Sequence, residues 1–145
     1  MEHKITSFPV IFICPDHNEK YKERKYHMIK LLYTLGFQTV YHYRSSSEAY
    51  PTCLARANIE VLSKHLNDEP ILLLEDDVEW TGWGDSVTIP PNADAVYFGL
   101  SKTRGSKTIN KDDGPSIFET YNSDMVRIIN MLSTHAILYI SKRYK

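Results

Sequence analysis

Three consecutive acidic residues, Glu75, Asp76 and Asp77, follow the apolar run at 71–74 (Ile-Leu-Leu-Leu) in this chain of 145 residues. Carboxylates this close together repel one another, and the repulsion raises their pKa values unless a cation shares the site. Hard divalent cations such as Mg²⁺ and Mn²⁺ prefer carboxylate oxygen ligands. The stretch therefore predicts a metal site, against the alternative of an acidic loop that faces solvent or caps a helix.

The apolar run that precedes the acids has the length of a β-strand, and Pro70 bounds it. Short apolar strands of this kind are typical of a parallel sheet that helices cover on both faces. Ligands of open α/β sheets bind outside the carboxyl ends of the strands, where these acids stand. Glu75 and Asp77 are two positions apart, so an ideal strand directs both side chains to the same side.

Strand and helix patterns alternate along the rest of the chain. Helical spacing covers residues 19–35, after the capping candidates Asp16 and Asn18, and residues 52–66. The order β-α-β-α-β predicts a parallel sheet with right-handed crossovers. Residues 101–114 are predicted to be a basic, polar loop. Strands are predicted at residues 8–14, 37–43, 71–74, 95–99, 116–121, 125–131 (alternatively helical) and 134–140.

The composition predicts one globular domain over residues 1–145. Hydrophobic residues make up 42% and charged residues 24%, which argues against disorder. A net charge of −1 argues against nucleic acid as the main partner. Cys14 and Cys53 lack metal-site spacing and are expected to be reduced thiols. Without a run of transmembrane length or a signal-peptide pattern, a cytoplasmic protein with at most peripheral membrane contact is expected.

Four segments carry a family resemblance, in this order: an apolar strand at 10–14 with a basic helix that ends Leu-Leu-Tyr-Thr-Leu-Gly at 31–36, a helix that begins near Cys53, Leu-Leu-Leu-Glu-Asp-Asp-Val at 72–78, and Ser-Thr-His-Ala-Ile-Leu-Tyr-Ile at 133–140. They resemble glycosyltransferase family 25, which includes bacterial lipopolysaccharide glycosyltransferases and collagen galactosyltransferases. The third segment is close to the family's Leu-Glu-Asp-Asp-Val pattern, and the fourth is similar to its Gly-Thr-His-Ala-Tyr-Leu-Ile segment.

The chain also departs from the family. It has Cys-Pro-Asp-His at 14–17, where the family usually has Asn-Leu-Asp-Arg, and Ala55-Arg56, where the family has a Ser-His pair. It ends soon after Ile140, where family members usually continue. A reduced acceptor site, or one completed by another domain or chain, is therefore expected.

The resemblance implies a short version of the GT-A fold, a mixed, mostly parallel sheet flanked by helices. It implies a hexosyltransferase that moves a sugar from a nucleotide diphosphate sugar, with UDP as the expected nucleotide, to a glycan or protein acceptor. Mn²⁺ or Mg²⁺ held by Asp77, Glu75 and His135 would stabilise the leaving diphosphate. Glu75 and Asp76 are also expected to contact the donor, and Asp76 and Asp113 are the candidate catalytic residues. For His135 the alternative is a half-buried strand histidine bonded to a backbone carbonyl.

Two other residues are candidates for donor binding. Arg56 on the second helix could reach a diphosphate or uracil through its guanidinium, and a surface arginine is the alternative. Asp16 after the first strand could accept from a base or ribose, with helix capping as the alternative.

Trp80 and Trp83 beside the acids could stack on a sugar or pack on the core. The basic residues within 102–111 could fold over a phosphate-bearing donor.

Two functions of other classes compete with the transferase. One is a non-catalytic domain of the same fold that binds nucleotide sugars or glycans. The other is a phosphatase of the dehalogenase type, whose motif is a strand followed by Asp-x-Asp and Thr. Here Asp77-Val-Glu79-Trp-Thr81 only approximates that motif, and it follows two β-α units where the phosphatase motif usually follows the first strand.

Overall fold

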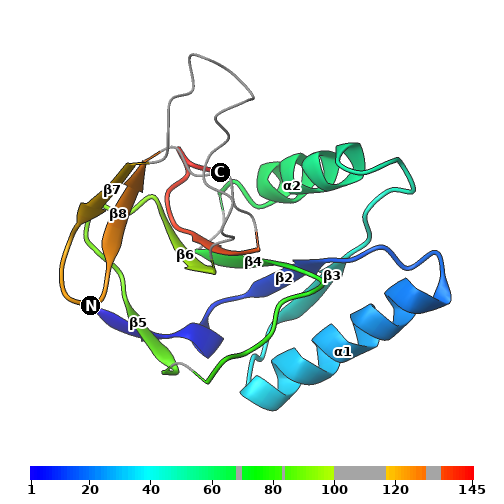
Figure 1. The fold of residues 1–145 in the computed structure, drawn as a ribbon, viewed down its shortest axis with the longest axis horizontal. Coiled ribbons are helices and arrows are strands. Elements are labelled where there is room, and N and C mark those ends of the chain that lie inside the picture. Colours follow the sequence, from blue (N-terminus) through cyan, green and yellow to red (C-terminus); the bar gives the residue numbers. More distant parts are fainter. Residues whose placement is uncertain (68–69, 83, 100–116, 130–134) are drawn as a thin grey trace. The chain divides into compact units, whose positions relative to one another are not determined.

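The computed structural model describes residues 1–67, 70–82, 84–99, 117–129 and 135–145 (Figure 1). The chain divides into two compact units, Met1–Phe98 with His135–Lys145, and Gly99–Thr134. The first contains the helices and the main sheet, and the second contains a strand pair.

A mixed five-stranded sheet with the order β3-β2-β4-β9-β6 forms the centre of the first unit. β2 (Val10–Ile13) runs parallel to both β3 (Val40–Tyr43) and β4 (Ile71–Glu75). β9 (Ala136–Tyr139) is antiparallel to β4, and β6 (Ala95–Gly99) lies at the edge beside β9. The prediction of an α/β fold with a mixed sheet and flanking helices is confirmed at this level.

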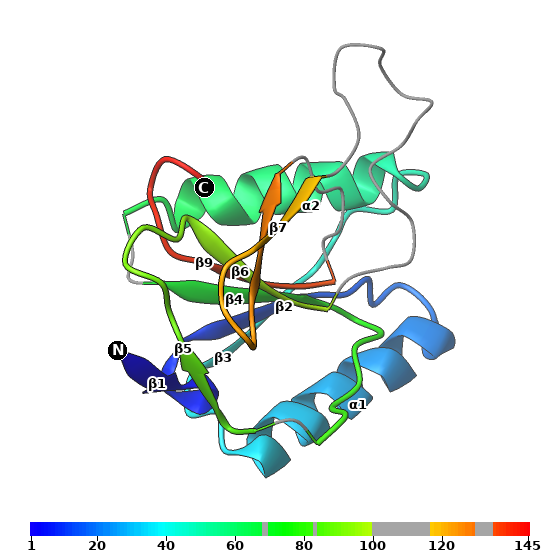
Figure 2. The ribbon, with the colours of Figure 1, turned by 60° about the vertical axis from the view of Figure 1, so that its left-hand side comes forward.

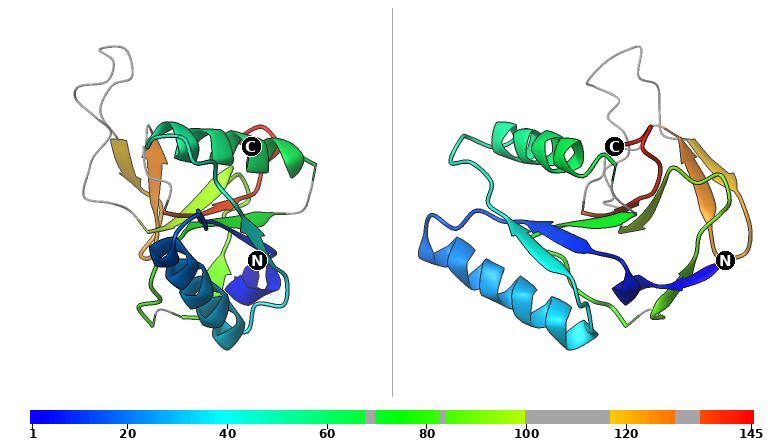
Figure 3. Two further views of the ribbon diagram at one scale, coloured as in Figure 1. Left: turned by 90° about the vertical axis from the view of Figure 1, so that its right-hand side faces the viewer. Right: turned by 180° about the vertical axis from the view of Figure 1, so that it is seen from behind.

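Two α-helices connect the parallel strands, and they lie on opposite faces of the sheet (Figures 1, 2 and 3). α1 (Glu19–Leu35) has the predicted bounds because a polar cap begins it and a glycine ends it. The side chain of Asn18 accepts a hydrogen bond from the Tyr21 N–H at 3.0 Å, and Gly36 takes the left-handed conformation (φ 97°) that suits glycine. α2 (Thr52–Lys64) ends two residues before the predicted boundary.

Strand alternation divides the core into two layers. The odd-numbered strand residues pack with α2 in one buried cluster, which contains Ile11, Ile13, Ala57, Val61, Ile71, Leu73, Ile137 and Tyr139. Their even-numbered neighbours are buried on the face toward α1, whose own buried residues are Met28 and Leu32. The buried even-numbered strand residues are Val10, Phe12, Leu72, Leu74 and Leu138. Successive residues of β4 therefore face different layers, which decides where the acids after it point.

Within the described residues, four short strands lie outside the main sheet. In the first unit β1 (Glu2–Lys4) pairs antiparallel with β5 (Ser86–Thr88), and a 3-10 turn, Ile5–Ser7, follows β1. The sequence did not predict this pair. In the second unit β7 (Ile117–Thr120) and β8 (Val126–Ile129) form an antiparallel pair, so the strand interpretation of the second segment is confirmed over the helical one.

Most predicted strands extend beyond the observed ones by a few residues. The clearest case is β3, which begins at Val40 although the pattern begins at Phe37. Phe37 is buried, and its N–H donates to the carbonyl oxygen of Leu32 at 3.1 Å, so this residue closes the end of α1. The predicted loop at 101–114 and Trp83 lie outside the described residues. Within the described residues, no helix combines the length and apolar character that a membrane crossing needs.

Candidate metal centre and adjoining pocket

Glu75, Asp77 and His135 converge at the carboxyl end of β4. One potential ligand atom from each of them lies within 4.8 Å of the others. Glu75 ends β4, Asp77 lies in the turn after it, and His135 immediately precedes β9. The structure thus brings together the three residues that were predicted as metal ligands.

The pairing of β4 with β9 places His135 in this cluster. Leu74 lies opposite Ala136 in the antiparallel register, so the next pair along is Glu75 and His135. The Glu75 N–H donates to the carbonyl oxygen of His135 at 3.0 Å. The imidazole Nδ1 of His135 lies 3.0 Å from a carboxylate oxygen of Glu75. Glu75 is largely buried, whereas the His135 side chain keeps 41% of its surface exposed, so the cluster opens to solvent.

The chemistry of this donor set fits Mn²⁺ or Mg²⁺. Two carboxylates supply the hard oxygen ligands that both ions prefer. The imidazole nitrogen favours Mn²⁺ over Mg²⁺. The metal residues predicted from sequence thus have compatible atom types and mutual distances, which is the condition for a shared ion.

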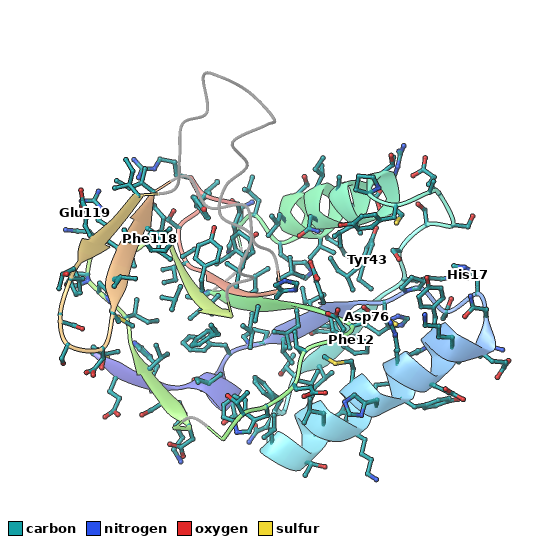
Figure 4. The ribbon with its side chains drawn as sticks, viewed as in Figure 1. Phe12, His17, Tyr43, Asp76, Phe118 and Glu119 are labelled. Carbon is teal, nitrogen blue, oxygen red and sulfur yellow. The ribbon has the colours of Figure 1, made fainter. Side chains whose placement is uncertain are left out.

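Asp76, the middle acid, lies apart from this group. Its carboxylate oxygen Oδ2 accepts from Nη1 of Arg24 on α1 at 3.3 Å and lies 3.5 Å from Sγ of Cys14. Burial, and then the negative charge of Asp76, raise the pKa of Cys14 to about 12, so the thiol stays protonated. Figure 4 shows Asp76 at the end of β4, with Phe12 between the sheet and α1. The expected roles of Asp76 in catalysis and donor binding stay predictions.

Asp16 follows β2 and is engaged by two cations. Its Oδ1 lies 2.5 Å from Nε of Arg44, and its Oδ2 lies 3.8 Å from Nζ of Lys25. The capping alternative fails for Asp16, because Asn18 provides the cap of α1. Oδ1 of Asp16 is buried, and its close contact with Arg44 is an ion pair without hydrogen-bond geometry.

A pocket of about 370 Å³ lies at the carboxyl end of β3. It contains two arginines and several hydroxyl groups, which suit a polar, anionic ligand. Its lining includes His17, Tyr43, Arg44, Ser45, Arg56 and Glu60. Figure 4 shows Tyr43 between the sheet and α2, where its hydroxyl donates to Glu60.

Arg56 is paired at the pocket wall. Its Nε and Nη2 donate to the two carboxylate oxygens of Glu48 at 2.7 and 3.0 Å. This bond and one from Ser46 lower the pKa of Glu48. Both partners are well exposed, so the pair is weak enough to be exchanged for a ligand phosphate. Arg56 is therefore an exposed arginine, as the alternative interpretation expects, and it also lies where it could contact a donor.

The strand register relates the pocket to the acids. Ile13 of β2 is level with Tyr43 on one side and with Glu75 on the other. Two strand spacings separate Tyr43 from Glu75, roughly 10 Å between backbones. All three residues are on the α2 face of the sheet, by alternation. The pocket and Glu75 therefore share one face and one edge of the sheet.

Sequence reasoning missed two contributors to this edge, Arg24 and Arg44. Arg44 directly follows β3, so the rule that loops after parallel strands form the site could have identified it. Arg24 belongs to the basic helix of the family resemblance, and it had no role of its own there. Trp80 is 41% exposed near the acids, while Asp113 lies outside the described residues.

Comparisons with protein-family models, with curated proteins and with solved structures find no match to this chain. The function is therefore argued from the residues of the site.

Proposed function

We propose that this chain is a metal-dependent glycosyltransferase with a short GT-A-type fold, which takes a sugar from a nucleotide diphosphate sugar and passes it to a glycan or protein acceptor. The observation that carries the proposal is the convergence of Glu75, Asp77 and His135 within 4.8 Å at the carboxyl end of a parallel strand. Expulsion of a nucleoside diphosphate places negative charge on phosphate oxygens, and a bound divalent ion would stabilise that charge.

The adjoining pocket supports a nucleotide as the donor's leaving group. Arg44 and Arg56 can donate to phosphate oxygens. The carboxylate of Asp16, which pairs with Arg44 after β2, would accept from an N–H of a base or a hydroxyl of ribose. A ligand with a nucleoside at one end and a diphosphate at the other would extend along the sheet edge from Tyr43 toward Glu75. We expect uridine as the nucleoside.

A second candidate is a domain that binds nucleotide sugars without transferring the sugar. One observation favours it: Asp76, an acid that sequence reasoning assigned to catalysis, is held by Arg24 and Cys14 on the α1 side. An acid engaged in this way is poorly placed to exchange a proton with an acceptor. The two candidates share a ligand and differ only in turnover.

Thermal unfolding with a panel of nucleoside diphosphates and nucleotide sugars, each with and without Mn²⁺, tests the shared part. A ligand that binds only the folded state raises the unfolding midpoint, by about 3 °C per kcal/mol for a chain of this size. We expect UDP with Mn²⁺ to give the largest shift, and Asp77→Ala to abolish it. Glu79→Ala is the matched control, because Glu79 is an exposed acid two positions further along.

Release of UDP from a UDP-sugar then separates the two candidates. Metal-dependent hydrolysis supports the transferase, and a thermal shift without hydrolysis or transfer supports the binding domain. No shift with any nucleotide at about 1 mM, where typical enzymes are near saturation, would exclude both.

A further inference from the structure

We infer that Arg24 on α1 is a positioning residue for the candidate metal centre, and that it acts through Asp76. The inference rests on the proposed metal-dependent function. It assigns different tasks to three adjacent acids: Glu75 and Asp77 face the ion, and Asp76 anchors the turn that holds them to α1.

The contacts of Asp76 are those of an anchored side chain. Only 14% of its side-chain surface is exposed, and its Oδ2 accepts from Arg24 and lies beside the Cys14 thiol. The guanidinium of Arg24 lies in turn over the ring of Tyr21, one turn earlier on α1, at 5.8 Å from its centroid. A carboxylate this buried requires a charged or hydrogen-bonding partner. These contacts therefore fix the direction of Asp76.

The position of Asp76 in the chain transmits that constraint. It stands between Glu75, which still belongs to β4, and Asp77, which lies in the turn. By alternation Asp76 points toward α1 while Glu75 points toward the α2 face. If Asp76 lost its partner, it would turn toward water and the backbone of the turn would follow. Asp77 would then lie too far from Glu75 and His135 to share an ion with them.

A purely electrostatic role for Arg24 predicts the opposite sign. A positive charge near Asp77 competes with a cation: the hydrogen bond to Asp76, and then the charges of Asp76 and Asp77, raise the pKa of Arg24. If charge alone mattered, Arg24→Gln would tighten Mn²⁺ binding and Asp76→Asn would weaken it. The double variant, in which one positive and one negative charge are lost together, would bind like the unaltered protein. A positioning role makes all three variants bind more weakly.

The test measures Mn²⁺ dissociation constants by calorimetry and by the electron paramagnetic resonance of free Mn²⁺, with the metal-free unfolding midpoint of each variant beside them. We expect Arg24→Gln and Asp76→Asn each to weaken Mn²⁺ binding about tenfold, the usual effect of removing a partner of a ligand-bearing segment. The double variant should bind Mn²⁺ no more weakly than the weaker-binding single variant, because both single substitutions remove the same link. Arg24→Lys should restore most of the affinity.

Lys22→Gln is the control, since Lys22 lies on the same helix in an exposed ion pair with Glu19 and should leave Mn²⁺ binding unchanged. Tighter or unchanged binding by Arg24→Gln, or normal binding by the double variant, would overturn the inference and leave the proposed function standing. Absence of Mn²⁺ binding by the unaltered protein would overturn both. If Arg24→Gln does not fold, Asp76→Asn and the double variant decide: unchanged Mn²⁺ affinity in either of them rejects the inference.

Discussion

Glu75 and His135 are joined twice, once through the backbone and once through their side chains. The Glu75 N–H donates to the carbonyl oxygen of His135 at 3.0 Å, and Nδ1 of His135 lies 3.0 Å from the Glu75 carboxylate. The link between β4 and β9 thus also orients the imidazole.

The first prediction concerns the choice of metal. Because imidazole suits Mn²⁺ better than Mg²⁺, His135→Gln should weaken Mn²⁺ binding about tenfold or more and weaken Mg²⁺ binding much less. Calorimetric titration with each ion measures the two affinities. His27→Gln, on the exposed side of α1, is the control and should change neither. An equal loss for both ions would mean that His135 acts on the fold of the site and not as a ligand.

The second prediction separates the nucleotide pocket from the metal centre. Arg44→Gln removes a cation that lines the pocket, so UDP binding at saturating Mn²⁺ should weaken about tenfold, the effect of one charged hydrogen bond of about 1.5 kcal/mol. Mn²⁺ binding alone should stay unchanged. Titration of UDP and of Mn²⁺ measures both. Arg143→Gln is the control, because Arg143 is an exposed arginine that pairs with Asp94. Weaker Mn²⁺ binding in Arg44→Gln would contradict the separation.

Local patterns predicted the elements that surround the site. The apolar run before Glu75 predicted β4 and placed the acids at its carboxyl end. The residues that cap and stop α1 predicted both of its bounds. The opposite directions of Glu75 and Asp76 follow from strand alternation and were within reach of the sequence. β1 and β5 were missed because strands of three residues carry no periodic pattern, and because their pairing joins residues more than eighty positions apart.

Long-range pairing limited the prediction of the site itself. His135 was expected only through the family resemblance, since nothing local brings it to a residue 60 positions earlier. The antiparallel register of β9 against β4 is what does so. The same holds for Arg24 and Asp76, which are 52 positions apart on different layers. Sequence periodicity identifies the face of a helix but not the residue that it meets.

The third prediction concerns the stability of the folded protein at acidic pH, to which Asp94 contributes through its bonds to the C-terminal segment. Hydrogen bonds from Ser141 and then Arg143, at 2.5 and 2.8 Å, lower the pKa of Asp94. A carboxyl group whose folded-state pKa lies below the unfolded value of about 3.9 adds stability above that value. That stability is lost as pH falls through the folded-state pKa. Asp94→Asn should therefore make the free energy of unfolding less dependent on pH below about 4.

Urea unfolding at a series of acidic pH values measures this dependence. Glu23→Gln, which changes an exposed carboxylate of α1, is the control. A pH dependence as steep in Asp94→Asn as in the unaltered protein would show that Asp94 does not contribute to it.

The last prediction concerns the two thiols. Cys14 is fully buried beside Asp76, and burial and that negative charge raise its pKa to about 12, whereas Cys53 lies partly exposed on α2. Only the thiolate reacts with an alkylating reagent, so iodoacetamide at about pH 8.5 should modify Cys53 and spare Cys14 in the folded protein. Peptide mass spectrometry after a short exposure measures both sites, and Cys53→Ser should remain unmodified until urea is added. Equal modification of Cys14 in the folded protein would mean that the contact between Cys14, Asp76 and Arg24 opens readily, and the anchor proposed for the acidic turn would be too loose to hold it.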